Sequence, residues 1–383
     1  MKKVVFVIES LRCGGAEKSL VTLLNNLDYS KLKVDLILFN EGGEFEKMVP
    51  EQVNLINKKL FRNIGFVIKL VGKINFFILR KFGKKKHNAQ HFWDVFKRLF
   101  DKHSRNYDIA IAYNQGFATY YVADKIEASK KIAWVNTDYQ KAGYNALSDI
   151  DIYKNYDSIV AVSEESKASF LAAFNKLLLK VDVIVIQDIL DDESIKKMAD
   201  LPLLSPTFNP KLVNILTVGR LVEAKGYPLA IDACKILINM GYQINWCVIG
   251  EGKERGNLEA LIKENKLEGS FNLLGFKENP YVYMKACDIY VQSSLFEGFG
   301  LSLFEALILN KPIVTSNFST ASTIISHNET GLICEMNSEA IANNIKYFID
   351  NPDFKNKIID NLLIKDSGNN KNTLEQFYQL INI

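Results

Sequence analysis

Two carboxylates bracket a glycine loop in the segment Glu297-Gly-Phe-Gly-Leu-Ser-Leu-Phe-Glu305, and the loop leads into an apolar, helix-forming stretch. Gly298 and Gly300 permit a tight turn, so the backbone amides that follow are expected to be the unpaired donors of a helix start. Those donors are the amides of Gly300, Leu301, Ser302 and Leu303. Such a helix start binds a phosphate, because its amides and its dipole both favour negative charge.

A carboxylate beside a phosphate needs a cation to neutralise the site, and two cations occur upstream. Arg220 follows a buried strand pattern at 213–218 through a single glycine, and Lys225-Gly226 precedes a helical pattern. Arginine offers a planar fork to phosphate oxygens, and lysine offers a point charge. The carboxyl end of a parallel strand is where an open α/β sheet binds its ligand. These residues therefore predict a phosphate site.

Together these motifs resemble the donor site of retaining glycosyltransferases with the GT-B fold, family 4. Arg220, Lys225 and the spacing Glu297-x7-Glu305 carry the resemblance. It is supported by Gly14-Gly15-Ala16-Glu17, by Leu274-Gly275-Phe276 before Pro280, and by Gly331-Leu332-Ile333. The match is strongest from about 213 to 348, weaker over the first ~40 residues, and weakest between 41 and 106.

The resemblance implies a nucleotide-sugar donor as substrate, with a UDP-sugar ahead of a GDP-sugar, and it implies no cofactor and no metal. Arg220, Lys225 and Glu297 are the expected catalytic residues. The two cations would stabilise the diphosphate as its charge grows, and Glu297 would orient the sugar rather than attack it. The same resemblance implies retention of anomeric configuration, with the departing phosphate oxygen accepting the acceptor's proton.

The other donor contacts are also expected from the resemblance. Glu305 would accept hydrogen bonds from the ribose hydroxyls, and the loop at Gly275 and Phe276 would line the base. The full donor-binding set is Gly14, Gly15, Gly275, Phe276, Glu297, Gly298, Phe299, Gly300, Leu301, Ser302, Leu303 and Glu305.

Each of these motifs also has a structural explanation that the sequence leaves open. The two glutamates could be surface acids at a helix start, where the dipole favours them. The turn at Gly14 could simply connect a strand to a helix, and Phe276 could be an ordinary core residue. His87 and His91 could share a helix face as metal ligands, but no third ligand accompanies them.

The sequence departs from the family pattern in two places. Many family members have His after the strand expected at 132–135, where this chain has Asn136 in Trp134-Val-Asn-Thr-Asp-Tyr139. Asparagine donates and accepts hydrogen bonds but cannot become cationic. Three consequences stay open: the sugar is held differently, Asp138 or a neighbour assists, or activity is reduced. Asn136 and Asp138 are assigned to the acceptor or sugar region. The usual Asn-Gly-Val-Asp turn is also replaced, here by Gln187-Asp-Ile-Leu190.

Short β-branched runs alternate with helical patterns along most of the chain, which predicts parallel sheets covered by helices on both faces. The expected architecture is α/β and GT-B, with two Rossmann-like doubly wound domains facing an interdomain cleft. We expect an acceptor-side domain at 1–190, a linker at 191–210 punctuated by prolines, and a sugar-nucleotide domain at 211–365. The resemblance implies that a C-terminal helix at 366–383 returns to the first domain.

Composition agrees with an intracellular globular protein. Of the 383 residues, 48% are apolar and 24% are charged. The five cysteines form no CxxC pair and are odd in number, which favours reduced thiols. The first apolar run is short and lacks a small-residue cleavage site, so we interpret it as a folded strand. The expected location is cytoplasmic, or peripheral on the inner face of the cell membrane.

One segment is strongly basic. Residues 58–103 contain 13 Lys and Arg but only two acids, a local net charge of +11 in a chain whose net charge is +3. Within it, intervals of 7, 4, 7 and 4 residues place five cations on one helical face. These cations are Arg62, Lys69, Lys73, Arg80 and Lys84. Such a stripe on a very apolar helix suits an anionic membrane surface, although burial against the first domain stays open.

Three classes of function remain. The leading prediction is a glycosyltransferase that builds cell-surface polysaccharide or glycolipid on a glycan or lipid-linked saccharide acceptor. The second is a glycosyltransferase with a protein or soluble acceptor. The third, motivated by Asn136, is a non-catalytic GT-B partner subunit. A nucleic-acid partner is not expected, and the absence of G-x-G-x-x-G after the first strand argues against a dehydrogenase.

Overall fold

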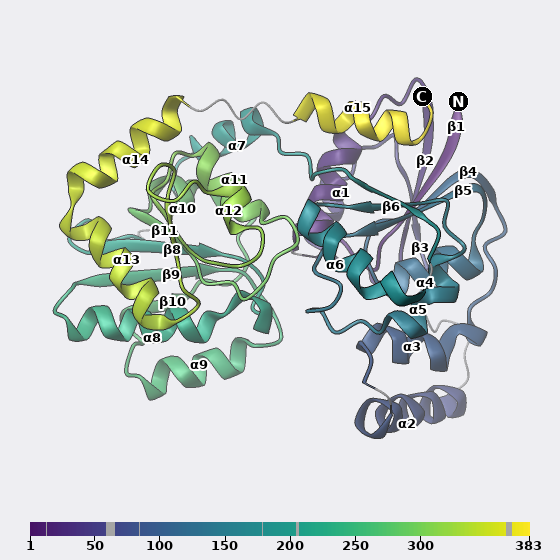
Figure 1. The fold of residues 1–383 in the computed structure, drawn as a ribbon, viewed down its shortest axis with the longest axis horizontal. Helices are drawn as coiled ribbons and strands as arrows, with labels where there is room; N and C mark the ends of the chain where they lie inside the picture. Colours follow the sequence, from purple (N-terminus) through teal and green to yellow (C-terminus); the bar gives the residue numbers. More distant parts are fainter. Residues whose placement is uncertain (13, 59–65, 84, 178, 204–206, 365–369) are drawn as a thin grey trace. The chain divides into compact units, whose positions relative to one another are not determined.

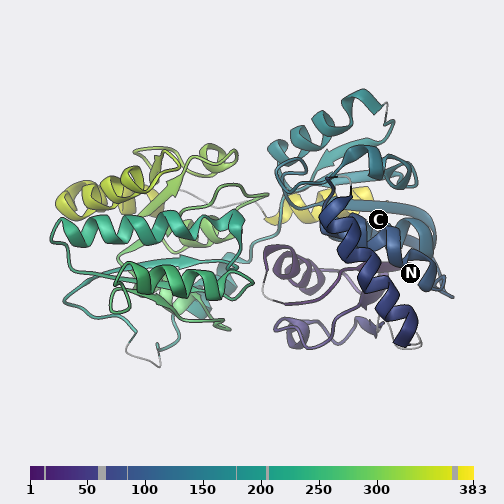
Figure 2. The same ribbon diagram turned by 90° about the horizontal axis from the view of Figure 1, so that it is seen from below.

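The computed structural model describes residues 1–12, 14–58, 66–83, 85–177, 179–203, 207–364 and 370–383. These residues form two compact units, unit 1 with Met1–Ile189 and Lys371–Ile383, and unit 2 with Leu190–Asn370. Each unit is built around one parallel sheet, and helices lie along both sides of it (Figures 1 and 2). The predicted α/β class with two doubly wound sheets is confirmed.

Unit 1 has a seven-stranded sheet in the order β3-β2-β1-β4-β5-β6-β7. The strands are β1 Lys2–Val7, β2 Leu32–Leu38, β3 Asn54–Asn57, β4 Asn106–Ala112, β5 Glu127–Val135, β6 Ser158–Ala161 and β7 Asp182–Val185. The helices are α1 Gly15–Asn25, α2 Phe66–Phe82, α3 Asn88–Phe96, α4 Phe117–Lys125, α5 Ala146–Tyr153, α6 Glu164–Phe174 and α15 Asn370–Leu380. The central strands are buried on both faces, which is why their sequences are continuous apolar runs rather than alternating ones.

The C-terminal helix α15 belongs to unit 1, although the chain that precedes it, Leu190–Asn370, forms unit 2. Phe377 stacks on Phe6 of β1, with ring centroids 6.2 Å apart. Lys2 Nζ donates to the carbonyls of Ile381 and Asn382, and Lys130 Nζ donates to that of Leu380. Two lysines thus satisfy carbonyls at the end of the helix, where its dipole favours cations.

Unit 2 has a six-stranded sheet in the order β10-β9-β8-β11-β12-β13. The strands are β8 Val213–Val218, β9 Ile244–Ile249, β10 Phe271–Leu273, β11 Ile289–Gln292, β12 Ile313–Ser316 and β13 Leu332–Cys334. The helices are α7 Asp192–Ala199, α8 Tyr227–Asn239, α9 Arg255–Glu264, α10 Tyr281–Ala286, α11 Leu301–Ile308, α12 Ala321–Ile324, α13 Ser338–Asp350 and α14 Pro352–Ile364.

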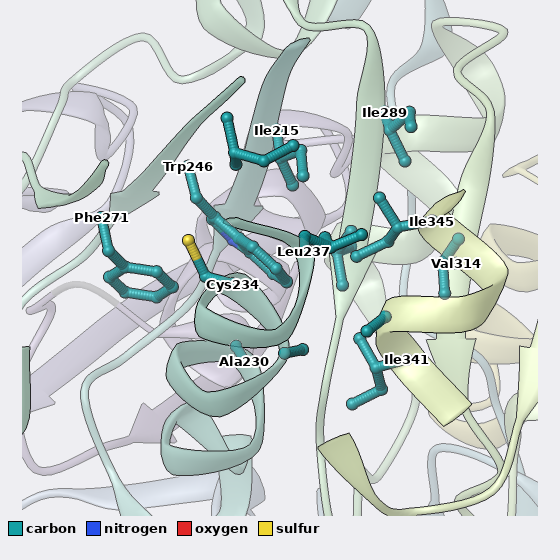
Figure 3. Close-up of a cluster of buried hydrophobic side chains, with 14 of the residues drawn as sticks. Ile215, Ala230, Cys234, Leu237, Trp246, Phe271, Ile289, Val314, Ile341 and Ile345 are labelled. Atoms are coloured by element: carbon teal, nitrogen blue, oxygen red, sulfur yellow. The ribbon is translucent and has the colours of Figure 1, made fainter. Parts of the chain in front are cut away.

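Alternate residues of the unit 2 strands supply two separate cores. Ile215 and Trp246 pack with residues of α8 and α13, as Figure 3 shows. Their neighbours Leu216 and Cys247 pack with residues of α10, α11 and α12 instead. Because successive strand side chains point to opposite faces, this division requires helices on both sides of the sheet.

The segment expected as a linker, 191–210, contains helix α7. Asp191 caps this helix by accepting a hydrogen bond from the Ser194 amide at 2.9 Å. Acids occupy its first turn and two lysines its last, in the arrangement that the helix dipole favours. The acids at the beginning of the expected linker, Asp191, Asp192 and Glu193, are therefore the start of a helix.

Among the helices that the structure describes, none combines the length and hydropathy that crossing a bilayer requires.

Candidate functional site

The strand order of unit 2 fixes where a ligand is expected. The chain winds outward from β8 through β9 to β10 on one side, then returns to β11 and continues to β13 on the other. At the carboxyl edge of the sheet, the chain therefore leaves β8 and β11 in opposite directions. In open α/β sheets this switch point is the usual ligand site.

Those two loops are joined directly to each other. The Leu295 amide donates to the Ala224 carbonyl at 2.7 Å, and Ser293 Oγ donates to the Lys225 carbonyl at 3.0 Å. Gly226 lies between them with φ +59°, and a Cβ there would be 2.2 Å from the Ser293 carbonyl oxygen. Glycine is required at this position by both the backbone conformation and the close approach.

One oxygen of Glu297 accepts three hydrogen bonds. Oε1 accepts from Lys225 Nζ at 2.6 Å, from Gln292 Nε2 at 2.7 Å and from Ser294 Oγ at 2.6 Å. The side chains of Lys225 and Glu297 are only 19% and 12% exposed, so their ion pair is held in a partly desolvated site. Within the described part of the chain, no hydrogen bond reaches Oε2 of Glu297. That oxygen remains available to a ligand.

Gln292, the last residue of β11, was not predicted to belong to the site. Its amide is 2% exposed, and its Oε1 accepts from Ser302 Oγ at 2.9 Å while its Nε2 donates to Glu297. It therefore connects the carboxylate to the first turn of α11. A polar residue that ends an apolar strand was the available signal, since a buried amide needs partners.

Arg220 is the second predicted cation, and it lies in the same loop as Lys225. Its side chain is exposed, and among the described residues it has no ion pair. The two cations therefore differ in state, because Lys225 is neutralised by Glu297 and Arg220 is not. Arg220 is the stronger candidate for binding an added anion.

Helix α11 begins after the glycine loop, as expected. Gly300 is its N-cap with φ +86°, and no side chain caps the helix. The prediction that Leu303 presents an unpaired amide is wrong, because this amide donates to the Gly300 carbonyl at 2.9 Å. The tight first turn leaves the preceding two amides, of Leu301 and Ser302, as the uncapped donors. Phe299 is buried and stacks on Phe304, which fixes the loop on the helix.

Three other residues of the predicted donor-binding set are buried or half-buried. They are Glu305, Gly275 and Phe276. Glu305 is 3% exposed and accepts from Tyr281 OH at 3.1 Å, so the second carboxylate of the motif is a buried one. Gly275 has φ +73°, and its carbonyl accepts from the Gly250 amide at 3.0 Å. Phe276 is half-buried rather than a core residue. The ribose and base contacts assigned to these residues stay predictions.

Unit 1 has its own switch point, between β1 and β4. Gly14 and Gly15 lie at the start of α1, after β1, and Gly14 has an extended backbone with φ −176°. A Cβ on Gly14 would be 2.1 Å from Oε2 of Glu17, so a carboxylate lies against this helix start. An ionised carboxylate here would repel an added phosphate, which disfavours contact between a donor phosphate and these two members of the predicted donor-binding set.

Buried amide groups gather at the carboxyl edge of the same sheet. Asn114 and Gln115 follow β4, and Asn136 follows the adjacent strand β5. Asn114 Oδ1, Gln115 Nε2 and both amide atoms of Asn136 are buried without a hydrogen-bond partner among the described residues. Gln115 Oε1 accepts from the Thr137 amide at 3.1 Å, which ties the two loops together. Buried polar groups without a protein partner are the kind of groups that bind a ligand or an ordered water.

Asp138 and His87 have structural partners. Asp138 Oδ1 accepts from the Gln140 and Lys141 amides and from Ser169 Oγ, so this carboxylate organises its own turn. His87 is the N-cap of α3, accepting from the Ala89 amide, and its ring stacks on Tyr144 at 4.1 Å. The histidine ring is thus used as a helix cap.

Comparisons with known proteins show what this chain is similar to. The family described as Glycosyl transferases group 1 matches residues 205–362. A similar protein of Campylobacter jejuni is N-acetylgalactosamine-N,N'-diacetylbacillosaminyl-diphospho-undecaprenol 4-alpha-N-acetylgalactosaminyltransferase, which is 29% identical over 88% of this chain and 87% of the relative. The amylovoran biosynthesis glycosyltransferase AmsK of Erwinia amylovora is 34% identical over 34% of each chain.

Solved structures share the fold over the whole chain. Anabaena HepE in complex with UDP and glucose superposes with a TM-score of 0.75 at 19% identity, covering 100% of both chains. Staphylococcus aureus TarM superposes with a TM-score of 0.67 at 15% identity, covering 100% of this chain and 99% of the other. This chain is a glycosyltransferase of the GT-B fold whose residues 205–362 are a glycosyl transferases group 1 (GT4) domain.

Proposed function

We propose that this glycosyltransferase transfers a sugar from a UDP-sugar to a lipid-linked saccharide, with retention of anomeric configuration, during assembly of a cell-surface glycan. The observation that supports this proposal is the switch point of unit 2. The loop that carries Arg220 and Lys225 follows β8, the loop that carries Glu297 and leads to the uncapped start of α11 follows the adjacent strand β11, and the Lys225–Glu297 pair joins the two loops. A cation, a positioned carboxylate and free amides are the groups that a sugar diphosphate requires.

In this mechanism the unit 2 residues act on the leaving group and on the sugar separately. Arg220 and the amides of Leu301 and Ser302 bind the diphosphate and stabilise its growing charge. Lys225 holds Glu297 by one oxygen at 2.6 Å, so that the other oxygen accepts from a sugar hydroxyl and orients the anomeric carbon. The departing phosphate oxygen accepts the proton of the attacking hydroxyl, so no side-chain nucleophile is needed.

The amide cluster of Asn114, Gln115 and Asn136 would bind the saccharide on unit 1. Its unpaired atoms are two amide nitrogens, which donate, and two amide oxygens, which accept. A sugar hydroxyl does both, and the cluster carries no charge. Neutral, mixed donor and acceptor groups suit a polyol better than a phosphate, in agreement with the carboxylate of Glu17 at the neighbouring helix start.

Names of relatives support the donor and the acceptor class. The relative from Campylobacter jejuni acts on a diphospho-undecaprenol saccharide by its name, and HepE was solved with UDP and glucose. The AmsK and TarM names connect other relatives with amylovoran and UDP. A UDP-sugar donor and a polyprenyl diphosphate saccharide acceptor are therefore the substrates to test first.

The test combines nucleotide binding with transfer. UDP should raise the melting temperature of the purified chain and bind in calorimetry, because a ligand stabilises the state that binds it. Arg220→Ala should weaken UDP binding by at least tenfold. Lys346→Ala removes a cation from the exposed Lys346–Asp350 pair on α13 and is the matched control. Release of UDP with a UDP-sugar and a polyprenyl diphosphate saccharide, followed by product analysis, tests transfer.

The outcomes separate the parts of the proposal. Unchanged UDP binding in Arg220→Ala would contradict the phosphate site, and a product of inverted configuration would contradict the mechanism. UDP binding without transfer to any lipid-linked saccharide, but with transfer to a soluble glycan or protein, would leave the donor site standing and overturn the acceptor.

A further inference from the structure

Helix α2 presents an unusually large apolar surface to solvent. Eight of its large side chains are between 36% and 75% exposed. They are Ile68, Leu70, Val71, Ile74, Phe77, Ile78, Leu79 and Phe82. Most of this helix is therefore not buried against its own domain, contrary to the alternative that the sequence left open. A contiguous exposed surface of this kind marks an interaction site.

One side of α2 is fixed to the protein. A Cβ on Gly72 would be 2.4 Å from Phe96 Cε1, so the helix backbone lies directly on the ring of α3. Phe76 adds an edge contact with Phe92, with ring centroids 6.3 Å apart. Figure 1 shows α2 outside α3, which separates it from the sheet of unit 1. The docked line of α2 therefore runs through residues 72 and 76.

The opposite side of α2 is apolar up to its last turn, where Lys81 lies seven residues after Ile74. Leu70, Ile74 and Ile78 are spaced by four residues, and each lies two residues from Gly72 or Phe76. Two residues correspond to about 200° around a helix, so these three side chains point away from α3. Phe77 lies beside them, three residues after Ile74. The outward face thus carries aliphatic and aromatic side chains that are 47% to 61% exposed.

Cations flank this apolar face. Lys73 and Arg80 are seven residues apart, so they lie on one edge of the helix between the docked line and the outward face. Both are exposed, as are Lys81 and Lys85. The sequence has no Asp or Glu between 66 and 86. Arg62 and Lys84 of the predicted stripe, and the side chain of Lys69, lie outside the described residues.

We infer that α2 binds the interface of an anionic lipid bilayer, with Leu70, Ile74, Phe77 and Ile78 entering the acyl boundary and Lys73 and Arg80 among the headgroups. An apolar face with cations along its edge is the pattern of helices that lie in the membrane interface. A second copy of this chain fits the surface poorly, since two such helices would bring their cations together without an acid to pair them. An anionic lipid surface supplies both the apolar and the negative partner.

Vesicle flotation of the full chain tests this inference. Recovery should be high with vesicles containing phosphatidylglycerol and low with pure phosphatidylcholine, and it should fall as salt screens the charges. Ile74→Ser/Phe77→Ser should lose binding to the anionic vesicles. Leu147→Ser/Leu171→Ser, which changes two exposed leucines of α5 and α6 in the same unit, should bind like the unchanged protein.

The cations are tested separately. Each cation near an anionic surface is worth about 1 kcal/mol, or roughly fivefold in partitioning. Lys73→Gln/Arg80→Gln should therefore weaken binding by more than tenfold, whereas Lys31→Gln/Lys154→Gln, two exposed lysines elsewhere in unit 1, should not. In Phe77→Trp, the new indole should be quenched by brominated acyl chains, which reports insertion rather than surface attraction.

Three results would overturn the inference. These are equal recovery with neutral and anionic vesicles, unchanged binding after Ile74→Ser/Phe77→Ser, and a dimer in solution that this variant abolishes while vesicle binding is absent. UDP binding measured on the same variants shows that they are folded. It also separates failure of the membrane surface from failure of the donor site.

Discussion

At the residue scale, Asn136 gives the sharpest test of the amide cluster. Burying an amide without partners costs about 1–3 kcal/mol, and both amide atoms of Asn136 are in that condition. Asn136→Leu keeps the approximate volume and removes the unpaired groups. We expect a higher free energy of unfolding together with at least a tenfold higher KM for the acceptor, while the KM for the UDP-sugar changes little.

A matched asparagine should behave in the opposite way. Asn145 caps α5, and its Oδ1 accepts from the Ser148 amide at 3.2 Å. Asn145→Leu should therefore lower the free energy of unfolding by about 1 kcal/mol. If Asn136→Leu were likewise destabilising and left acceptor kinetics intact, the amide cluster would be part of the fold and not a subsite.

Asp188 makes a second residue-scale prediction, on pH. Burial raises the pKa of its carboxyl group from 3.8 to about 7, although Ser19 Oγ donates to it at 2.5 Å. The folded state then holds a proton that the unfolded state has lost between about pH 4 and 7. The free energy of unfolding should fall as pH rises through this window, because the unfolded state binds fewer protons there.

Asp188→Asn removes this titration while keeping an oxygen that can accept from Ser19. The free energy of unfolding of the variant minus that of the unchanged protein should therefore be larger at pH 8 than at pH 5. Urea unfolding of both proteins at both pH values measures this difference. Asp151→Asn, at a carboxylate whose side chain is 88% exposed, is the control and should show no such difference. A constant difference for Asp188→Asn across pH would refute the assignment.

The residues of the site differ in how far the sequence could predict them. Arg220, Lys225 and Glu297 stand out because charged residues follow buried strands or glycines, and the structure places Lys225 and Glu297 2.6 Å apart. Gln115 carries no such mark, and Gln292 is marked only as a polar residue that ends an apolar strand. Only the order and register of neighbouring strands bring them to the switch points, and one sequence does not contain that register.

At the scale of elements, Gly226 controls how the two loops of unit 2 meet. With φ +59°, an alanine there would adopt a left-handed backbone at a cost of about 1–2 kcal/mol, and its Cβ would displace Ser293. Gly226→Ala should therefore lower the free energy of unfolding and weaken UDP binding together, since Lys225 and Ser294 would shift away from Glu297. Thermal denaturation and calorimetry measure the two effects.

A second variant, Gly241→Ala, separates the cost of the left-handed backbone from the effect of the clash with Ser293. Gly241 has φ +93°, but, apart from this residue itself and its chain neighbours, no atom of the described residues lies within 4 Å of where its Cβ would be. Gly241→Ala should show the backbone cost alone, with UDP binding retained. Loss of UDP binding in Gly241→Ala, or its retention in Gly226→Ala, would show that the close approach of the two loops does not position the site.

Helices and strands could be predicted where buried apolar residues form a continuous run in the sequence. Strand β8 has the predicted bounds, 213–218, because a strand buried on both faces is a continuous apolar run. β3 was missed, since Asn54–Asn57 is short, lies at the sheet edge and is mostly exposed. α7 was missed because its polar first turn was interpreted as loop, although an N-cap followed by acids predicts a helix start.

At the scale of the whole molecule, the C-terminal helix makes unit 1 depend on residues far along the chain. Phe377 is 1% exposed and lies against Phe6 of β1 and Trp134 of β5, with ring centroids 6.2 Å and 6.3 Å away. A single sequence gives the amphipathic pattern of this helix but not the sheet on which it packs. Its place reflects complementarity between two distant apolar surfaces.

Phe377→Ala should therefore weaken unit 1 selectively. Truncating a buried phenylalanine costs about 3–5 kcal/mol. Hydrogen exchange should show lost protection in β1 and β5, while β8 and β9 of unit 2 stay protected. Phe348→Ala, at a side chain of α13 that is 0% exposed in the unit 2 core, should reverse this pattern. If each variant instead lowered protection in both sheets equally, the two units would unfold as one cooperative body, and UDP bound to unit 2 would stabilise unit 1 as well.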